Sequence, residues 1–496
     1  MHALDLLVIA AYLAGITWFG ARFRTRQTGL RDYFLGGRTT PWWAISLSIV
    51  SAETSTLTVI GTPALAFNGN FGFLQVVFGY LLARLVISTL FLPLYFQGEM
   101  FTAYELMRNR FGERLRRLTA GTFLVLRALA EGVRVFALSL IVNVVLGPLY
   151  SRWHAPELSE LASILVIVCL TLFYTFEGGL AAVIWTDVVQ MILYVLGAAV
   201  SFIVLLHQIP GGWLPAFHSA SAAGKFALFD FRFSFSLAFF SRSYSFWAGI
   251  LGGCFLTTAS HGTEQLMVQR LLAARNIRES RLALFSSWAV IFIQFTLFLL
   301  IGALLYVYYG LTHTPAPNPA DRIYPDFVWN HLPQGIAGLA IAAILAAGMS
   351  NLSAALNSLA STTMMDFVYA RLHSRPAESK MLSQARWMTA AWAGVLVTIG
   401  LIARHWGSVL EAGLSIASIL YGGLLGVFLL GTLTRRVGES AAMVGMAAGL
   451  VSTVALKLFT PVAFTWYVLA GTSAAFLAGL AASLFFPNTR TNDAAN

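Results

Sequence analysis

Residues 42–67 read WWAISLSIVSAETSTLTVIGTPALAF. The run is long enough to cross the hydrocarbon core of a membrane, which takes about 20 apolar residues. Its middle, residues 51–58, is polar and contains the carboxylate of Glu53, and Gly61 and Pro63 follow. Polar groups at membrane depth are costly, and unwound backbone there exposes carbonyls that can bind a cation. The stretch predicts an interrupted transmembrane helix; the alternative is a continuous helix whose Ser and Thr side chains only pack against neighbours.

The composition of the whole chain agrees with a membrane protein. Of its 496 residues 58% are hydrophobic and 10% are charged, and the mean hydropathy is +0.75. Because an average soluble domain has about 25% charged residues, a soluble enzyme, a nucleic-acid binder, a secreted disulfide scaffold and a disordered chain are excluded. The net charge of +10 is then better explained by basic cytoplasmic loops than by nucleic acid.

Thirteen runs can serve as transmembrane helices. They lie at about 4–21, 42–67, 71–97, 118–149, 159–176, 182–207, 244–268, 283–309, 335–367, 387–404, 410–433, 440–458 and 462–486. Alternating these spans from an outside N-terminus places 21 of the 31 Lys and Arg residues in cytoplasmic segments, 7 outside and 3 within spans. This bias predicts an N-terminus outside and a C-terminus in the cytoplasm of a bacterial-type inner (plasma) membrane. A cleaved signal peptide is disfavoured because the basic residues follow the first run.

Two further apolar runs contain polar clusters. Residues 257–265 read TTASHGTEQ, five spans after the first interruption, and such matching interruptions are typical of transporters with inverted repeats. Residues 346–354 read AAGMSNLSA, in which Ser350 and Ser353 share a helix face. Hydroxyl and amide oxygens suit a small hard cation. The alternatives are small-residue helix packing for the second cluster and a purely structural role for His261 in the first.

One face of the run at 118–149 combines Arg127, Glu131 and Arg134. A buried ion pair is the simplest interpretation, but three charges cannot pair evenly. One arginine therefore needs an anionic solute or another carboxylate, and Arg84 raises the same question. The carboxylates available in other apolar runs are Glu53, Glu264 and Asp187.

Several motifs resemble those of the sodium/solute symporter family, which includes sodium-coupled sugar, proline, sialic acid and monocarboxylate carriers. They are DYFLGGR at 32–38, EGGLAAVIWTD at 177–187, Gln265 with VQR at 268–270, MSNLS at 349–353, NS at 357–358 and MD at 365–366. The resemblance covers nearly the whole chain. It implies an all-α polytopic membrane protein with about 13 transmembrane helices and the LeuT-type fold. In a single domain over 1–496, a leading helix at 4–21 would precede two inverted five-helix repeats, at about 42–207 and 244–433, and two extra helices at about 440–486.

The resemblance also implies sodium sites. The shared site would take the carbonyls of Ser51, Thr54 and Ala347 and the side chains of Ser350 and Asn351. Many relatives have a hydroxyl where Asn351 stands, although an amide oxygen can also ligate sodium.

A second sodium site would use Asp187, Ser350 and Ser353. Ala354 stands where some relatives have another hydroxyl, so this second site lacks one oxygen.

Sodium-driven symport of a small polar organic solute by alternating access is the expected function. Sialic acid carriers bind the solute carboxylate with an arginine close to the place of Arg127, whereas the aromatic gate of sugar carriers is replaced here by Ser260 and His261. We therefore favour a carboxylate-bearing solute: an organic acid, a sialic acid or an amino acid. The expected solute-binding residues are Glu53, Ser55, Thr58, Gln75, Arg127, Ser260 and His261.

Three alternatives remain open. The first is sugar or polyol symport, with an aromatic residue such as Trp247 stacking on the ligand. The others are proton coupling through Glu53 or Asp187 and a sensor that does not transport. We expect no catalytic residues, no cofactor besides the coupling sodium ion, no nucleic-acid partner and a monomeric protein.

Overall fold

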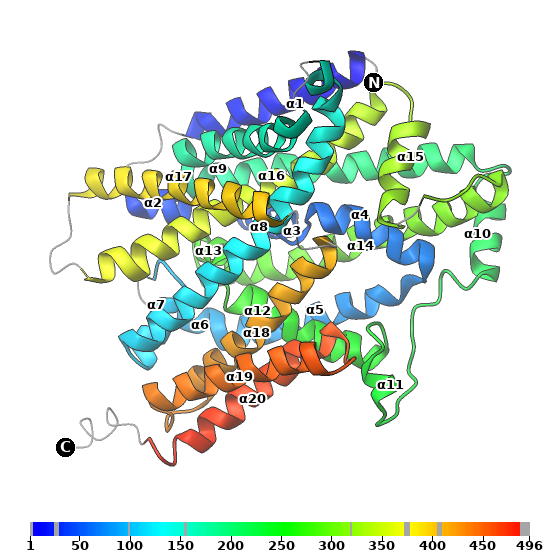
Figure 1. Ribbon diagram of the computed structural model, residues 1–496. Helices are drawn as coiled ribbons and strands as arrows, with labels where there is room; N and C mark the ends of the chain where they lie inside the picture. Colours follow the sequence, from blue (N-terminus) through cyan, green and yellow to red (C-terminus); the bar gives the residue numbers. More distant parts are fainter. Residues whose placement is uncertain are drawn as a thin grey trace.

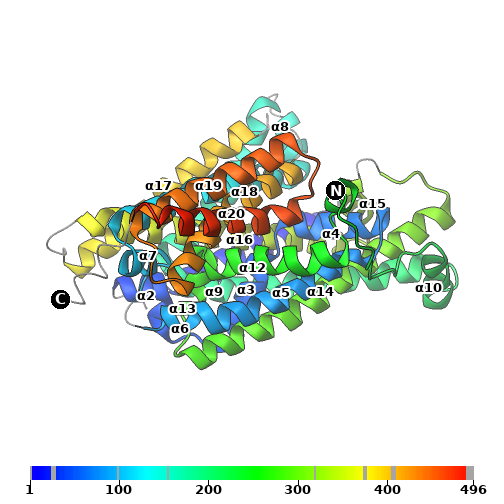
Figure 2. The ribbon, with the colours of Figure 1, turned by 90° about the horizontal axis from the view of Figure 1, so that it is seen from below.

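The computed structural model describes residues 3–23, 29–97, 100–152, 156–317, 320–371, 377–403 and 409–486, which are almost entirely helical. The long helices run in a common direction in both ribbon views (Figures 1 and 2). α1 (Ala3–Ala21) begins at one end of the molecule, and α20 (Tyr467–Ala482) ends at the opposite one. An odd number of membrane crossings requires such an arrangement.

The helices follow the predicted runs. The first half contains α2 (Leu30–Leu35), α3 (Trp42–Glu53), α4 (Thr56–Asn68), α5 (Leu74–Val86), α6 (Leu92–Tyr95), α7 (Tyr104–Arg110), α8 (Glu113–Arg152), α9 (Pro156–Gln208), α10 (Trp213–Ala222) and α11 (Leu237–Phe240). The second half contains α12 (Gly253–Gly262), α13 (Gln265–Leu272), α14 (Ile277–Thr312), α15 (Ile323–His331), α16 (Ile336–Thr362), α17 (Glu378–Ala403), α18 (Val409–Leu433) and α19 (Glu439–Phe459). Each of the thirteen runs is covered by one helix or by a short series of helices.

Not every run passes a strict test for a membrane span. Within the described residues, nine helices are long and apolar enough, or ten when α3 and α4 count as one. Of the other runs, α8 contains a row of charged residues, and the first part of α9 supplies only the shorter apolar helix Leu161–Phe173. The run at 244–268 is divided among a π-helix (Ala248–Gly252), α12 and α13.

The polar stretch at 51–58 interrupts its helix, as predicted. α3 ends at Glu53 and α4 begins at Thr56, and the axes of Trp42–Glu53 and Thr58–Asn68 differ by 63°. Ser55 restarts the helix because it forms a capping box with Thr58: the Thr58 N–H donates to Ser55 Oγ (3.3 Å), and the Ser55 N–H donates to Thr58 Oγ1 (3.2 Å).

This box engages the N–H groups of Ser55 and Thr58. In a continuous helix these two groups would donate to the carbonyls of Ser51 and Thr54. The capping box therefore frees the two carbonyls that the sequence nominates for sodium.

The second predicted interruption is also present. α12 ends at Gly262 and α13 begins at Gln265, with Thr263 and Glu264 between them. The cluster at 346–354, in contrast, lies within the unbroken helix α16. Every residue from 340 to 362 is buried, and most of them are small, so neighbouring helices approach α16 closely.

Gly179 divides α9 between the predicted runs at 159–176 and 182–207. Its φ of 55° and ψ of −152° are reached easily only by glycine. A Cβ atom there would also lie 2.6 Å from the carbonyl oxygen of Tyr33. We expect Gly179→Ala to lower the free energy of unfolding by about 1–3 kcal/mol and to lower the melting temperature in detergent.

The matched control is Gly394→Ala in α17, where a Cβ atom would meet no atom within 4 Å. This control should leave the melting temperature nearly unchanged. Equal shifts for the two variants would show that the bend at Gly179 is not strained by a side chain.

Candidate functional site

A cavity of about 240 Å³ lies beside the break between α3 and α4. Its polar wall is formed by Glu53, Ser55, Thr58, Thr62 and Arg134. Its aromatic wall is formed by Phe73, Tyr80, Tyr244, Phe295 and Phe464. Binding sites for small solutes commonly combine such apolar walls with a few convergent polar groups.

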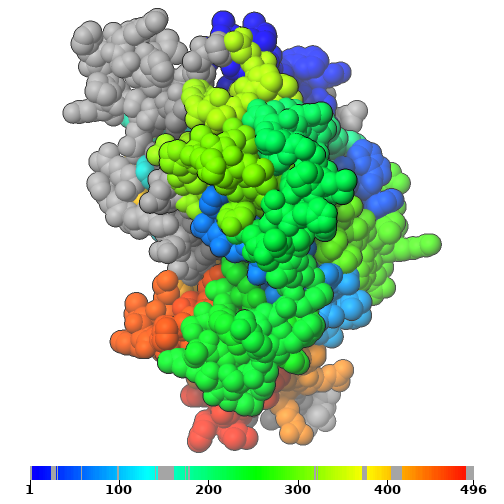
Figure 3. Space-filling view, turned by 90° about the vertical axis from the view of Figure 1, so that its right-hand side faces the viewer, coloured from blue at the N-terminus to red at the C-terminus, as the bar shows by residue number. Residues whose placement is uncertain are grey.

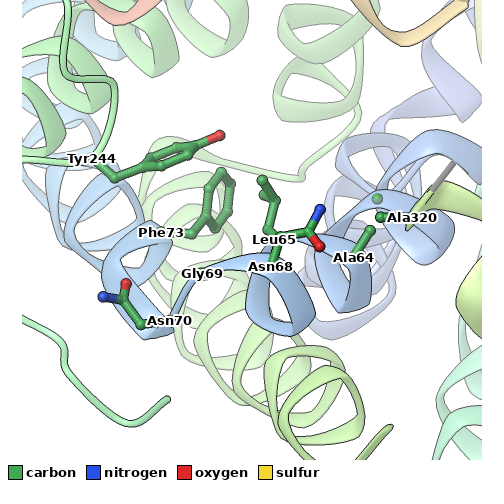
Figure 4. A pocket seen from close by; sticks show the side chains of 9 residues that line it. Ala64, Leu65, Asn68, Gly69, Asn70, Phe73, Tyr244 and Ala320 are labelled. Atoms are coloured by element: carbon green, nitrogen blue, oxygen red, sulfur yellow. The ribbon is translucent and has the colours of Figure 1, made fainter. Parts of the chain in front are cut away.

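A recess of about 490 Å³ adjoins the cavity and shares Gly61, Leu65, Phe73 and Tyr244 with it. Figure 4 shows this recess, with the rings of Phe73 and Tyr244 next to each other; their centroids are 5.7 Å apart. Asn68 and Asn70 lie on the adjacent backbone. The recess therefore lies on one side of these two rings and is lined mainly by small and apolar residues, together with Asn68 and Asn70.

Glu53 borders the cavity but is already paired. Its Oε2 lies 3.0 Å from Nη2 of Arg84, and its Oε1 lies 3.3 Å from Nε2 of His261. Nδ1 of His261 is in turn 2.8 Å from the hydroxyl of Ser260. The trio joins the end of α3 to α5 and α12.

Arg84 is completely buried, and its remaining donors are also engaged. It donates to the carbonyls of Leu284 and Tyr80 and to Ser287 Oγ. A guanidinium with this many internal acceptors orients Glu53 and offers little to a solute.

The arginines of α8 have different surroundings. Arg127 pairs with Glu131 (3.0 Å) and with Glu264 at the α12–α13 break (3.3 Å), and its side chain is 6% exposed. Within the described residues, Arg134 pairs with Glu131 alone (3.1 Å), and its side chain is 27% exposed. Tyr421 of α18 donates its hydroxyl to Glu264. Among the described residues, Arg134 is therefore the arginine at the cavity wall, two helical turns beyond Arg127.

The residues nominated for the shared sodium site lie together. The hydroxyls of Ser51 and Ser350 are 2.7 Å apart. Asn351 Nδ2 donates to the carbonyls of Thr54 (2.8 Å) and Ala347 (3.1 Å). All five are buried, and they supply the hard oxygen atoms that suit sodium.

The orientation of Asn351 is unexpected for a sodium ligand. Its amide nitrogen, rather than its oxygen, points at the two carbonyls, and its Oδ1 is buried without a hydrogen-bond partner in the described structure. The amide thus supplies the positive partner that these carbonyls would find in a cation.

The residues nominated for a second sodium site are only partly assembled. Ser350 Oγ donates to Asp187 Oδ1 (2.7 Å), but Ser353 Oγ donates to the carbonyl of Ser350 within the same helix (2.9 Å). The other oxygen of Asp187 accepts from Ser48 (2.5 Å) and from Nη2 of Arg270 (2.8 Å). The guanidinium therefore already neutralises the carboxylate.

Of the remaining expected solute-binding residues, some border the cavity and one lies behind its wall. Ser55 and Thr58 border the cavity. Gln75 is fully buried behind it: its Nε2 donates to the carbonyl of Tyr244 (2.9 Å), and its Oε1 accepts from the N–H of Asp230 (3.1 Å). Trp247 packs on Phe233 and Phe246, and the cavity lining in the described structure does not include it.

Residues 33–449 match the sodium:solute symporter family. The chain belongs to this family. It is 27% identical over 496 residues to the sodium/sialic acid symporter NanT of Aliivibrio fischeri, an alignment that covers 99% of this chain and 95% of that one. It is 28% identical to the human sodium-coupled monocarboxylate transporter 2, over 93% of this chain and 74% of the transporter.

A solved structure extends the likeness to three dimensions. A sodium-coupled sialic acid symporter, in its substrate-bound outward-open state, superimposes with a TM-score of 0.85 at 26% identity and covers 98% of both chains. The fold is thus the LeuT-type fold of membrane transporters, as predicted. This symporter is a sodium-coupled solute carrier and not an enzyme.

Sequence reasoning placed Arg134 on a charged helix face but did not include it among the expected solute-binding residues, and it did not identify the aromatic wall. A signal for Arg134 was available, because it shares the face of Arg127 at a spacing of seven residues. The aromatic wall had no such signal, because Phe73, Tyr244, Phe295 and Phe464 come from four separate parts of the chain.

Proposed function

We propose that this symporter couples one sodium ion to a small carboxylate-bearing solute, an organic acid, a sialic acid or an amino acid, by alternating access. The observation that carries the proposal is Arg134. It is the most exposed charged group in the cavity wall, and it shares its only ion-pair partner in the described structure with Arg127. A guanidinium in this position can donate two parallel hydrogen bonds to a solute carboxylate.

The charge balance around the cavity supports an anionic solute. Arg84 offsets Glu53, while Arg127 and Arg134 offset Glu131 and Glu264. These six side chains together carry no net charge. One sodium ion makes the site positive, and one carboxylate restores neutrality, which is favourable at membrane depth. Both oxygens of Glu53 are engaged, so the amine of a zwitterion finds a weaker partner there.

Sugar or polyol symport is the second candidate. The aromatic wall favours it, because a sugar could pack on the rings of Phe73 and Tyr244, which line the cavity. Aromatic rings also suit the apolar parts of an organic acid. A sugar, unlike an acid, would give Arg134 no carboxylate to bind.

The proposed stoichiometry is one sodium ion per solute, bound by Ser51, Thr54, Ala347, Ser350 and Asn351. Ion pairing with Arg270 leaves Asp187 little attraction for a second cation. Proton coupling through Glu53 or Asp187 would require either carboxylate to leave an arginine partner.

We further propose thirteen spans in a bacterial-type plasma membrane, with the N-terminus outside, the C-terminus in the cytoplasm and a monomer as the working unit. The leading helix would be 4–21, the inverted repeats about 42–207 and 244–433, and the extra helices about 440–486. The strongest support is the concentration of Lys and Arg in alternate loops.

The test is thermal unfolding of the purified protein with panels of carboxylates, amino acids and sugars, in sodium and again in choline. A ligand at 100 times its dissociation constant stabilises the native state by about 2.7 kcal/mol. We expect a rise in melting temperature with carboxylates in sodium and a much smaller one in choline. A rise in melting temperature with sugars alone would favour the second candidate. Changes in melting temperature that depend on pH but not on sodium would favour proton coupling.

A further inference from the structure

The loop between α10 and α12 contains a ladder of phenylalanines. Residues 229–235 read FDFRFSF and form neither helix nor strand. Phe229, Phe231, Phe233 and Phe235 are 51%, 59%, 53% and 88% exposed. Alternation of aromatic and polar residues gives an extended segment one apolar edge and one polar edge.

The polar side chains of this segment form hydrogen bonds and ion pairs with one another and with Arg242. Asp230 accepts from Nε of Arg232 (2.7 Å) and from Nη1 of Arg242 (2.8 Å). The hydrogen bonds from Arg232 lower the pKa of Asp230, so the carboxylate stays charged. The hydroxyls of Ser234 and Ser236 are 2.9 Å apart. The exposed rings are therefore the unsatisfied part of the segment, because apolar surface in water is unfavourable.

The ladder is fixed at the level where membrane-spanning helices begin. Phe229 stacks on Phe78 of α5, with ring centroids 6.0 Å apart. The Phe246 N–H, just before the π-helix that leads into α12, donates to the carbonyl of Asp230 (2.8 Å). Phe240, at the end of α11, packs on Trp466 at the start of α20, with centroids 5.2 Å apart. Three helix starts thus hold the segment close to one edge of the helical bundle.

The exposed rings continue into the exposed surface of these helices. Trp247 and Leu251, in and next to the π-helix, are 38% and 40% exposed, and Leu82 of α5 is 41% exposed. The ring of Phe233 lies 5.7 Å from that of Trp247. Figure 3 looks onto the end of the molecule that carries α10 and α15, and the green segment after α10 covers the lower part of this face. The apolar edge is thus continuous with exposed apolar side chains of the neighbouring helices.

We propose that residues 229–237 lie along the membrane interface, with the Phe231, Phe233 and Phe235 rings among the lipids and the Asp230, Arg232 and Ser234 side chains towards water. Aromatic rings are favoured at the headgroup level of a bilayer. An extended segment with one aromatic edge can lie flat there because its polar edge and backbone remain hydrated. The occupant of this surface is the lipid bilayer itself.

The proposal also gives the buried Gln75 a clear part. Its side chain bridges the N–H of Asp230 in the ladder and the carbonyl of Tyr244, whose side chain borders the cavity. A ladder held at the membrane surface would thereby fix one wall of the cavity.

The test measures depth along the ladder in nanodiscs that contain one copy of the protein. In a background with Cys169→Ala and Cys254→Ala, single nitroxide labels are placed at Phe233→Cys and Phe235→Cys and, as matched controls, at Arg232→Cys and Ser234→Cys. Electron spin resonance then compares collisions with oxygen, which dissolves in lipid, and with a water-soluble nickel chelate. Because all four side chains are exposed, the labels should be tolerated, and a melting temperature for each variant checks the fold.

We expect labels at 233 and 235 to collide at least several-fold more with oxygen relative to nickel than labels at 232 and 234. Equal access of nickel to all four sites would overturn the proposal and make the ladder an ordinary aqueous loop. Labels at 233 and 235 that are shielded from both reagents would also overturn it, because protein would then cover the rings. Shielding that appears only in nanodiscs with two copies would identify the occupant as a second copy instead.

Discussion

Replacing Arg127 by glutamine is expected to lower the stability of the fold, whereas replacing Arg134 by glutamine is expected to weaken solute binding. Arg127→Gln leaves Glu264 without its arginine and Glu131 with only one, at a place where all three side chains are nearly buried. Removing one partner of a buried ion pair typically costs about 3–5 kcal/mol. We expect a large fall in melting temperature for this variant, with or without solute.

Arg134→Gln should behave in the opposite way. Glu131 keeps Arg127, so the melting temperature of the solute-free protein should change little. A carboxylate solute would lose charge-assisted hydrogen bonds worth about 1.5–3 kcal/mol, which corresponds to a dissociation constant about 10- to 150-fold weaker. Isothermal titration in sodium measures this loss directly.

Two further variants sharpen the comparison. Arg134→Lys keeps the charge but loses the planar fork, and it should recover part of the affinity. Thr62→Ala removes another polar group from the same wall without a change of charge, and it should weaken binding much less. If Arg134→Gln binds carboxylates normally while Arg127→Gln binds them weakly at an unchanged melting temperature, Arg127 is the solute ligand and our assignment is wrong.

The helix breaks could be predicted from sequence, because their cause is local. The capping box of Ser55 and Thr58 lies within four residues and ends one helix and starts the next, whereas Gly61 and Pro63 lie inside α4. The bend at Gly179 also fell between two predicted runs, although the sequence did not say that its φ would be positive.

Partner choice could not be predicted in the same way. The sequence allowed several arginines as the partner of Glu53. Its pairing with Arg84 depends on how α3 packs against α5. Likewise, the spacing of Arg127 and Arg134 predicts that they share a helix face, but it does not predict how deeply each side chain is buried. The depth depends on Glu264, which comes from a break 137 residues further along the chain. Gln75 was expected to bind the solute, but its hydrogen bonds to Asp230 and Tyr244 come from tertiary packing.

Substituting Asn351 is expected to change the sodium dependence of uptake by this symporter more than its affinity for any solute. In the described structure, Asn351 Nδ2 donates to the carbonyls of Thr54 and Ala347, so an internal donor stands where sodium would join the two helices. At the site we propose, sodium would have to displace this donor, and the amide would have to turn its buried Oδ1 towards the ion. Each neutral hydrogen bond that is lost weakens ion binding by about 0.5–1.5 kcal/mol.

Asn351→Ser removes the amide that bridges the carbonyls of Thr54 and Ala347 and leaves a hydroxyl oxygen that can ligate sodium. We therefore expect the sodium concentration for half-maximal uptake to fall by up to about 5- to 150-fold in proteoliposomes, because the two amide hydrogen bonds no longer compete with the ion. Uptake in choline should fall as well, because the amide no longer holds α3 and α16 together without sodium.

Asn351→Ala is the matched control, since it removes the competing donor and the ligand oxygen together. Its half-maximal sodium concentration should lie well above that of Asn351→Ser, and the difference between these two variants isolates the contribution of the oxygen. If Asn351→Ser needs as much sodium as the unaltered protein, the amide does not compete with the ion. If it needs more, the amide oxygen is already a sodium ligand at no cost, and the contacts to Thr54 and Ala347 play no part in coupling.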